Sequence, residues 1–173
     1  DEVSPGEVVW WAAYNLLVFA VVPYLVFRRR GYEHRAMGLK SEHVKNDALL
    51  ILVILTLESI AELTTFPGLL SLSGRQLLIG MPFTLLLHLL GTGVPVMIFV
   101  YALLFPRYLK VTGSAASAAV LGALTYAALH IFEYWTVYDS LTSGILSVIF
   151  VFLQFAYPGL IKSVLTLRTG NAW

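Results

Sequence analysis

The sequence has no cysteine and little charge. Without cysteine, the chain has no disulfides, thiolate nucleophiles or cysteine-ligated metal centres. Charged residues make up 12% of the chain and hydrophobic residues 58%, whereas soluble domains average about 25% and roughly 45–50%. A mean hydropathy of +0.81 leaves too little polar surface for a soluble domain. The net charge of +1 gives no reason to expect nucleic acid as a partner. The composition indicates an integral membrane protein with lipids as partners.

Five apolar runs are long enough to cross a hydrocarbon core of about 30 Å at about 1.5 Å per helical residue. The expected spans are residues 8–27, 47–66, 77–105, 114–135 and 141–165. The third run contains Pro82 and Pro95 and predicts one long, kinked helix, with two half-helices as the alternative. Small residues such as Ala119 and Gly122 predict a close helix neighbour for the fourth span. The sequence therefore predicts a single all-α domain, a polytopic transmembrane helical bundle. Because it begins with Asp1 rather than Met, we expect that it can be a fragment of a longer chain.

The distribution of Lys and Arg predicts the orientation of the bundle. With the N-terminus outside, ten cations lie on the inner side: Arg28, Arg29, Arg30, Arg35, Lys40, Lys45, Arg107, Lys110, Lys162 and Arg168. Only Arg75 lies outside. We therefore expect a multi-pass protein of a prokaryotic plasma membrane, with residues 28–30 as a topology anchor that contacts lipid phosphates.

Five ionisable side chains lie inside the apolar runs: Glu58, Glu62, His88, His130 and Glu133. Such groups cost several kcal/mol in hydrocarbon unless they are paired or wet, so they are candidates for a functional site. In the predicted orientation all five can converge in the outer leaflet. We expect Glu58 and His130 to approach each other in the bundle interior, directly or through one water or ion.

Two chemistries suit this set of residues. Carboxylates and neutral histidines bind zinc, iron or manganese, so one divalent transition metal is a candidate cofactor for the whole set: Glu58, Glu62, His88, His130 and Glu133. Without a metal, the candidate catalytic residues are Glu58 or Glu62 as general base and His130 as oxyanion stabiliser. The structural alternative is that His88 bonds a helix neighbour, while Glu62 and Glu133 are solvated at the membrane boundary.

Residues 126–130 read Tyr-Ala-Ala-Leu-His, and residues 103–109 read Leu-Leu-Phe-Pro-Arg-Tyr-Leu. These segments resemble motifs of the CPBP family of intramembrane proteins, named for CAAX prenyl proteases and bacteriocin-processing enzymes. The family has a Glu-Glu-x-x-x-Arg motif, then Phe-x-x-x-His, and later His-x-x-x-Asn/Asp. Residues 36–40 and 167–173 also resemble the family's entry to its second span and the lead-in to its third motif. The resemblance implies a helical membrane fold with His130 in its site.

The chain departs from the family pattern at the first motif. Tyr101 and Ala102 stand where the family has its glutamates, and Arg107 comes one position late. The first glutamate is the family's proposed water-activating base, so the resemblance implies a scaffold without protease activity. The third motif would fall beyond Trp173. We therefore expect a CPBP-like scaffold or accessory subunit, with other membrane-protein subunits as candidate partners.

Two alternatives stay open from the sequence. One is an intramembrane hydrolase or metalloenzyme that uses Glu58, Glu62, His88 and His130. The other is a small transporter or proton-relay protein in which the same side chains carry protons and the kinked third span acts as a gate.

Overall fold

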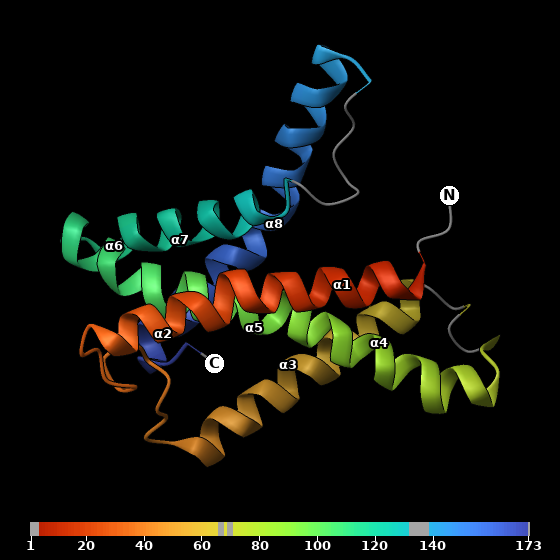
Figure 1. Ribbon diagram of the computed structural model, residues 1–173, viewed down its shortest axis with the longest axis horizontal. Coiled ribbons are helices and arrows are strands. Elements are labelled where there is room, and N and C mark those ends of the chain that lie inside the picture. The colour runs from red at the N-terminus through yellow and green to blue at the C-terminus, as the bar shows by residue number, and fades with distance from the viewer. Residues whose placement is uncertain (1–3, 66–67, 69–70, 132–138, 173) are drawn as a thin grey trace.

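The computed structural model describes residues 4–65, 68, 71–131 and 139–172, except for several side chains of the second helix. The described part is all-helical (Figure 1). The first helix, Pro5–Arg29, consists of α1 (Pro5–Asn15), the π-helical segment η1 (Leu16–Val21) and α2 (Val22–Arg29). Ser4 begins it with a capping box, in which its hydroxyl accepts from the Glu7 N–H and its N–H donates to the Glu7 carboxylate.

The second helix, α3 (Val44–Thr65), is followed by one long helix, Gln76–Thr112. The long helix consists of η3 (Gln76–Gly80), α4 (Met81–His88), η4 (Leu89–Gly93), α5 (Val94–Val96), η5 (Met97–Leu104) and α6 (Phe105–Thr112). The prediction of one long helix is thus confirmed, and the alternative of two half-helices is wrong.

Prolines explain where the π-helical segments lie. Segments η1, η3, η4 and η5 each end two residues before a proline, at Pro23, Pro82, Pro95 and Pro106. Proline lacks an N–H and its ring clashes with the carbonyl four residues earlier. The wider π turn removes that clash, so the helix continues through each proline.

The last two helices are α7 (Ala115–Leu129) and α8 (Leu141–Thr169). Helix α7 ends at Leu129, because the His130 and Ile131 N–H groups turn to carbonyls three residues back, Ala127 and Ala128. The predicted fourth span reached residue 135; residues 132–138 lie outside the described residues, so that boundary stays a prediction. Helix α8 continues through Pro158, although Pro158-Gly159 stands inside its apolar run.

Small residues let the helices approach closely, as the sequence predicts for the fourth span. A Cβ placed on Gly122 of α7 would lie 2.6 Å from the Ser163 Oγ of α8. A Cβ on Gly159 of α8 would lie 3.0 Å from the Ala123 Cα of α7. Tyr101, on the long central helix, adds a hydrogen bond from its hydroxyl to the Gly159 carbonyl at 3.2 Å. Helices α7 and α8 therefore pack backbone to backbone, beside the central helix.

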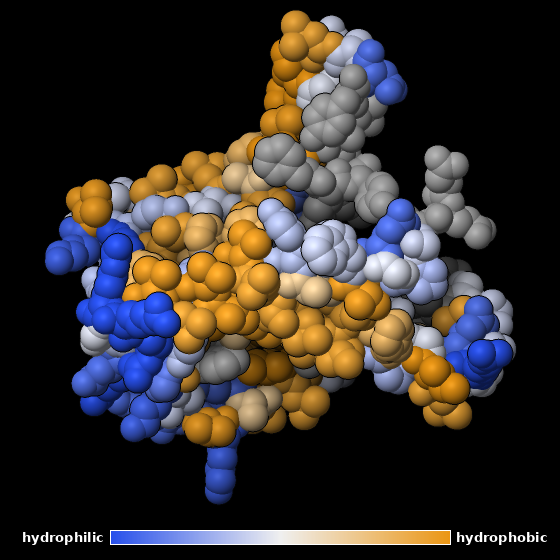
Figure 2. All heavy atoms as spheres, viewed as in Figure 1, coloured by the Kyte–Doolittle hydropathy of each residue, from blue (hydrophilic) through white to orange (hydrophobic). Residues whose placement is uncertain are grey.

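Three helices are long and apolar enough to cross a membrane: Pro5–Arg29, Gln76–Thr112 and Leu141–Thr169. Apolar side chains cover much of the visible face, whereas hydrophilic residues gather at its left end, where α2 ends (Figures 1 and 2). The Leu49–Val53 stretch of α3 is exposed on all sides, since these five successive residues span more than one turn and are all exposed. A stretch that is apolar all round favours an apolar environment, and the described fold fits a helical membrane protein.

The polar end joins three parts of the chain. The Ala172 N–H donates to the Gly38 carbonyl at 2.9 Å, and the Asn171 side-chain amide donates to the Asp47 carboxylate at 2.7 Å. The Arg107 guanidinium lies 4.0 Å from the centre of the Phe27 ring. These contacts fasten the C-terminal residues to the segment after the first helix, and the central helix to the end of the first helix.

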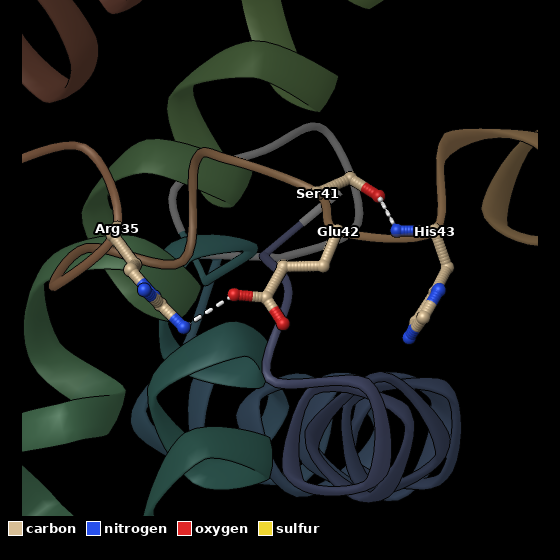
Figure 3. Close-up of polar contacts among 4 residues, drawn as sticks. All are labelled: Arg35, Ser41, Glu42 and His43. Atoms are coloured by element: carbon tan, nitrogen blue, oxygen red, sulfur yellow. Dashed lines mark hydrogen bonds and ion pairs between the residues drawn. The ribbon is translucent and has the colours of Figure 1, made fainter.

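The segment between α2 and α3 carries its own polar contacts (Figure 3). Arg35 forms an exposed ion pair with Glu42 at 2.5 Å, and the His43 N–H donates to the Ser41 Oγ at 3.0 Å. Surface ion pairs contribute about 0–1 kcal/mol each, so this segment is held mainly by the fully buried Met37 side chain and by its contacts with the C-terminal residues.

Candidate functional site

His130 is buried at the end of α7, with 4% of its surface exposed. Its ring stacks on Phe155 of α8, with centroids 3.9 Å apart and planes at 11°. Tyr126, one turn earlier on α7, meets the imidazole edge to face at 4.9 Å. Two aromatic rings from two helices therefore fix the orientation of the imidazole.

His130 borders a cavity of about 550 Å³ between the first helix, the central helix and α7. The lining residues are Trp11, Tyr14, Asn15, Phe19, Gly91, Thr92, Pro95, Val96, Ala128, Leu129 and His130. Most of this wall is apolar or aromatic, and its polar groups belong to Tyr14, Asn15, Thr92 and His130. We call this space the His130 cavity.

Gly91 brings the first helix onto the central helix at this cavity. A Cβ on Gly91 would lie 2.4 Å from the Trp11 Cζ3, which is closer than real Cβ contacts come. Only glycine leaves room for the indole against the central helix at this point. No sequence pattern predicts this contact, because the two residues are far apart along the chain.

A second polar feature lies next to His130, between α7 and α8. The Lys162 Nζ donates to the Tyr126 hydroxyl at 3.2 Å and lies 4.5 Å from the centre of the same ring. Sequence reasoning assigned Lys162 only to the inner cation set, although it falls inside the expected fifth span. Its position within that span was the signal that could have marked Lys162 as a candidate functional residue, since an ionisable residue within a span is a functional candidate by default.

The central helix presents Tyr101 and Ala102 to the same core. Tyr101 is buried, and its hydroxyl donates to the Gly159 carbonyl, which also accepts from the Ser163 hydroxyl at 2.9 Å. Ala102 is fully buried. Both positions are therefore occupied by packed side chains of the core.

The structure separates the predicted site residues into three groups. His130 lines a cavity, whereas His88 is exposed at the end of α4. Glu58 and Glu62 lie four residues apart in the continuous helix α3, but their side chains are outside the described set, as is all of Glu133. Helix α3 has no extensive packing against another element in the described part of the chain. The predicted approach of Glu58 to His130 therefore stays a prediction.

A metal site was one expectation from the sequence. Among the described residues, no group of three or more His, Asp or Glu side chains is arranged to hold a metal ion. Because three of the five proposed ligands have undescribed side chains, a site made by Glu58, Glu62, His88, His130 and Glu133 stays a prediction.

Together these features define a protein that is all-helical in its described part, with helices long and apolar enough to span a membrane and an aromatic cavity beside a buried histidine. No family model matches the chain, and neither does any curated protein or solved structure. The resemblance to the CPBP family thus rests on the sequence motifs alone.

Proposed function

We propose that this chain is a multi-pass membrane protein with a CPBP-like scaffold that works as a binding or accessory subunit without protease activity. The observation that carries the proposal is the environment of Tyr101. In the resembling family a glutamate at this position activates the hydrolytic water, whereas Tyr101 is buried here and bonded to the Gly159 carbonyl. A phenol with an ordinary pKa near 10 is a poor proton acceptor at neutral pH.

The His130 cavity supplies the binding site in this proposal. Its volume of about 550 Å³ falls in the range of small-molecule sites, about 300–1,000 Å³, which are mostly apolar with a few polar groups. A small, largely apolar molecule with one hydroxyl or carbonyl fits this lining. Asn15 and Thr92 are the groups that would orient its polar atom.

The same proposal includes five spans with the N-terminus outside. Its support is that the Leu49–Val53 stretch of α3 is apolar and exposed on every side, and that the end of α2, Arg107 and the C-terminal residues meet at one end of the bundle. A reporter fused after Arg30 should be cytoplasmic, and one at Asp139 extracytoplasmic. The opposite labelling would contradict the orientation.

The absence of proteolysis is tested by comparing the full chain with Glu58→Gln and His130→Ala variants on prenylated and unprenylated peptides. We expect no turnover by the parent above that of either variant. Turnover by the parent that both substitutions abolish would show that a relocated base supports hydrolysis, and the proposal would be wrong. Metal analysis of the purified protein adds an independent check, because a stoichiometric transition metal would favour the metalloenzyme.

Binding in the His130 cavity is tested with a photoreactive alkanol that carries a diazirine. Cross-links should map to residues 11–19 and 91–96, which form two of its walls. Ala128→Phe places a ring in the cavity and should remove this labelling. Leu124→Phe, one turn earlier on α7 and outside the lining, is the matched control and should leave it unchanged. Equal labelling of both variants would exclude the cavity as the site.

A further inference from the structure

A second cavity lies between the first helix and the central helix, toward the polar end of the bundle. Its volume is about 540 Å³, and its lining residues are Leu16, Ala20, Val21, Tyr24, Leu25, His34, Leu39, Val94 and Ile98. We call it the Tyr24 groove. All of its lining is apolar except for Tyr24 and His34, which come from α2 and the segment that follows it.

The two polar residues of the groove form a pair. The Tyr24 hydroxyl and the His34 Nε2 lie 2.6 Å apart, and the two rings are nearly parallel, at 5°, with centroids 5.9 Å apart. This pair gives the apolar groove one hydrogen-bonding end, which is the arrangement that an amphiphile requires.

Cations continue the wall of the groove beyond this pair. In α2, Arg28 follows Tyr24 by four residues and Arg29 follows Leu25 by four, so each arginine lies one turn further along the same face. The Arg28 Nη1 donates to the Tyr32 carbonyl at 2.8 Å, which holds that guanidinium beside the polar end. The charge of Arg35 is already paired with Glu42, so Arg35 is not part of the proposed phosphate site.

We propose that the Tyr24 groove binds one anionic phospholipid, with an acyl chain in the apolar groove and its phosphate near Arg28 and Arg29. Charge complementarity selects this occupant, because guanidinium groups match phosphate geometry and basic pockets between spanning helices bind anionic head groups. The acyl chain occupies the Leu16, Ala20 and Val94 part of the wall. The proposal requires only that the first and central helices lie in a membrane, and it is independent of the His130 cavity.

The experiment is native mass spectrometry of the full chain released from micelles that contain phosphatidylglycerol and phosphatidylcholine with identical acyl chains in equal amounts. We expect one retained phosphatidylglycerol in preference to phosphatidylcholine. Arg28→Gln and Arg29→Gln should each weaken this retention about fivefold, the effect of about 1 kcal/mol per basic residue near an anionic lipid. Arg168→Gln, at the end of α8, is the matched control for net charge and should leave retention unchanged.

A second pair of variants tests the groove itself. Leu25→Trp places an indole in the groove and should lower retention of the lipid, whereas Leu17→Trp, on the same helix, exposed and outside the lining, should not. Circular dichroism confirms that each variant is folded before it is compared.

Four outcomes would overturn the proposal. Equal retention of the two lipids would exclude head-group recognition, and a loss with Arg168→Gln as large as with Arg28→Gln would indicate unspecific charge attraction. If the Leu25→Trp variant retains the lipid as well as the parent does, the groove is excluded as the binding site of the acyl chain. Displacement of the lipid by glycerol 1-phosphate would assign the site to free phosphate instead.

Discussion

The contact between Gly91 and Trp11 gives the sharpest test of how the first helix docks. In a Gly91→Ala variant the new methyl group would lie 2.4 Å from the indole Cζ3 and 2.9 Å from two further ring atoms. Either the indole moves toward the His130 cavity, which it lines, or the two helices separate. Both responses lose contacts between the first helix and the central helix.

The magnitude follows from two opposing effects. Overpacking a well-packed site costs about 1–3 kcal/mol, while alanine in place of glycine gains about 1 kcal/mol in helix propensity. The Gly80→Ala variant isolates the second effect, since Gly80 also lies in a π-helical segment of the central helix and has nothing within 4 Å of a Cβ. The difference between the two variants therefore measures the clash alone.

Thermal unfolding in detergent, followed by circular dichroism, measures that difference. For a chain of this size about 1 kcal/mol corresponds to roughly 2–4 °C, so Gly91→Ala should unfold about 2–12 °C below Gly80→Ala. A Trp11→Leu substitution removes the ring, and in that background the two alanine variants should differ little.

Equal unfolding temperatures for Gly91→Ala and Gly80→Ala would refute the contact. A difference that persists at full size in the Trp11→Leu background would refute its assignment to the indole. In either case the His130 cavity would lose the wall that the first helix supplies.

Three further substitutions test other contacts, two by thermal unfolding and one by proteolysis. Gly159→Ala should destabilise the protein by about 1–3 kcal/mol, because two of the three nearest atoms are backbone atoms of Ala123 and cannot turn aside; stability equal to the parent would contradict the close approach of α7 and α8. Arg107→Lys should cost about 1 kcal/mol, since a flexible ammonium replaces a planar guanidinium stacked on aromatic rings, and an unchanged unfolding temperature would argue against that stacking. Asn171→Ala removes a hydrogen bond to Asp47, worth about 1.5–3 kcal/mol when the acceptor is charged, and should speed proteolysis of the C-terminus; an unchanged cleavage rate would show that the end is held elsewhere.

Helix positions could be predicted from the sequence because long apolar runs and charged ends are local signals. The ends of Pro5–Arg29 agree with the predicted span to within a few residues. The prolines of the central helix were expected to kink it, and the structure accommodates them with π turns. The end of α7 at Leu129 could not be predicted, because apolar and aromatic residues continue past it without a proline or glycine to stop the helix.

The candidate site was less accessible to sequence reasoning. His130 could be identified from the sequence because placing an imidazole in an apolar run costs free energy, which makes such a residue a candidate for function. The aromatic wall of its cavity could not be identified, since Trp11 and Phe19 are ordinary residues in a span. Only their closeness to the central helix in the fold gives them a role. Lys162 was visible in the sequence, but its partner Tyr126 depends on how α7 and α8 pack.

Tyrosine hydroxyls account for much of the specificity in this packing. In lipid, helices gain little from burying apolar surface against each other, so interhelical hydrogen bonds and close packing determine how they dock. Tyr101 bonds the Gly159 carbonyl of α8, Tyr126 bonds Lys162 of α8, and the Tyr108 hydroxyl lies 2.8 Å from the Thr125 hydroxyl of α7. A phenylalanine at any of these positions would keep the apolar area and lose the link between two helices.

This use of tyrosine bears directly on the proposed loss of proteolysis. A base at position 101 would need a water molecule and space for a substrate carbonyl beside it. The Tyr101 hydroxyl instead donates a hydrogen bond to a backbone carbonyl of α8, and Ala102 beside it is fully buried. The position therefore joins the central helix to α8, and the cavity next to His130 lies elsewhere, between the first helix, the central helix and α7. This division of the interior supports the proposed binding without hydrolysis, which the comparison of the parent with the Glu58→Gln and His130→Ala variants tests.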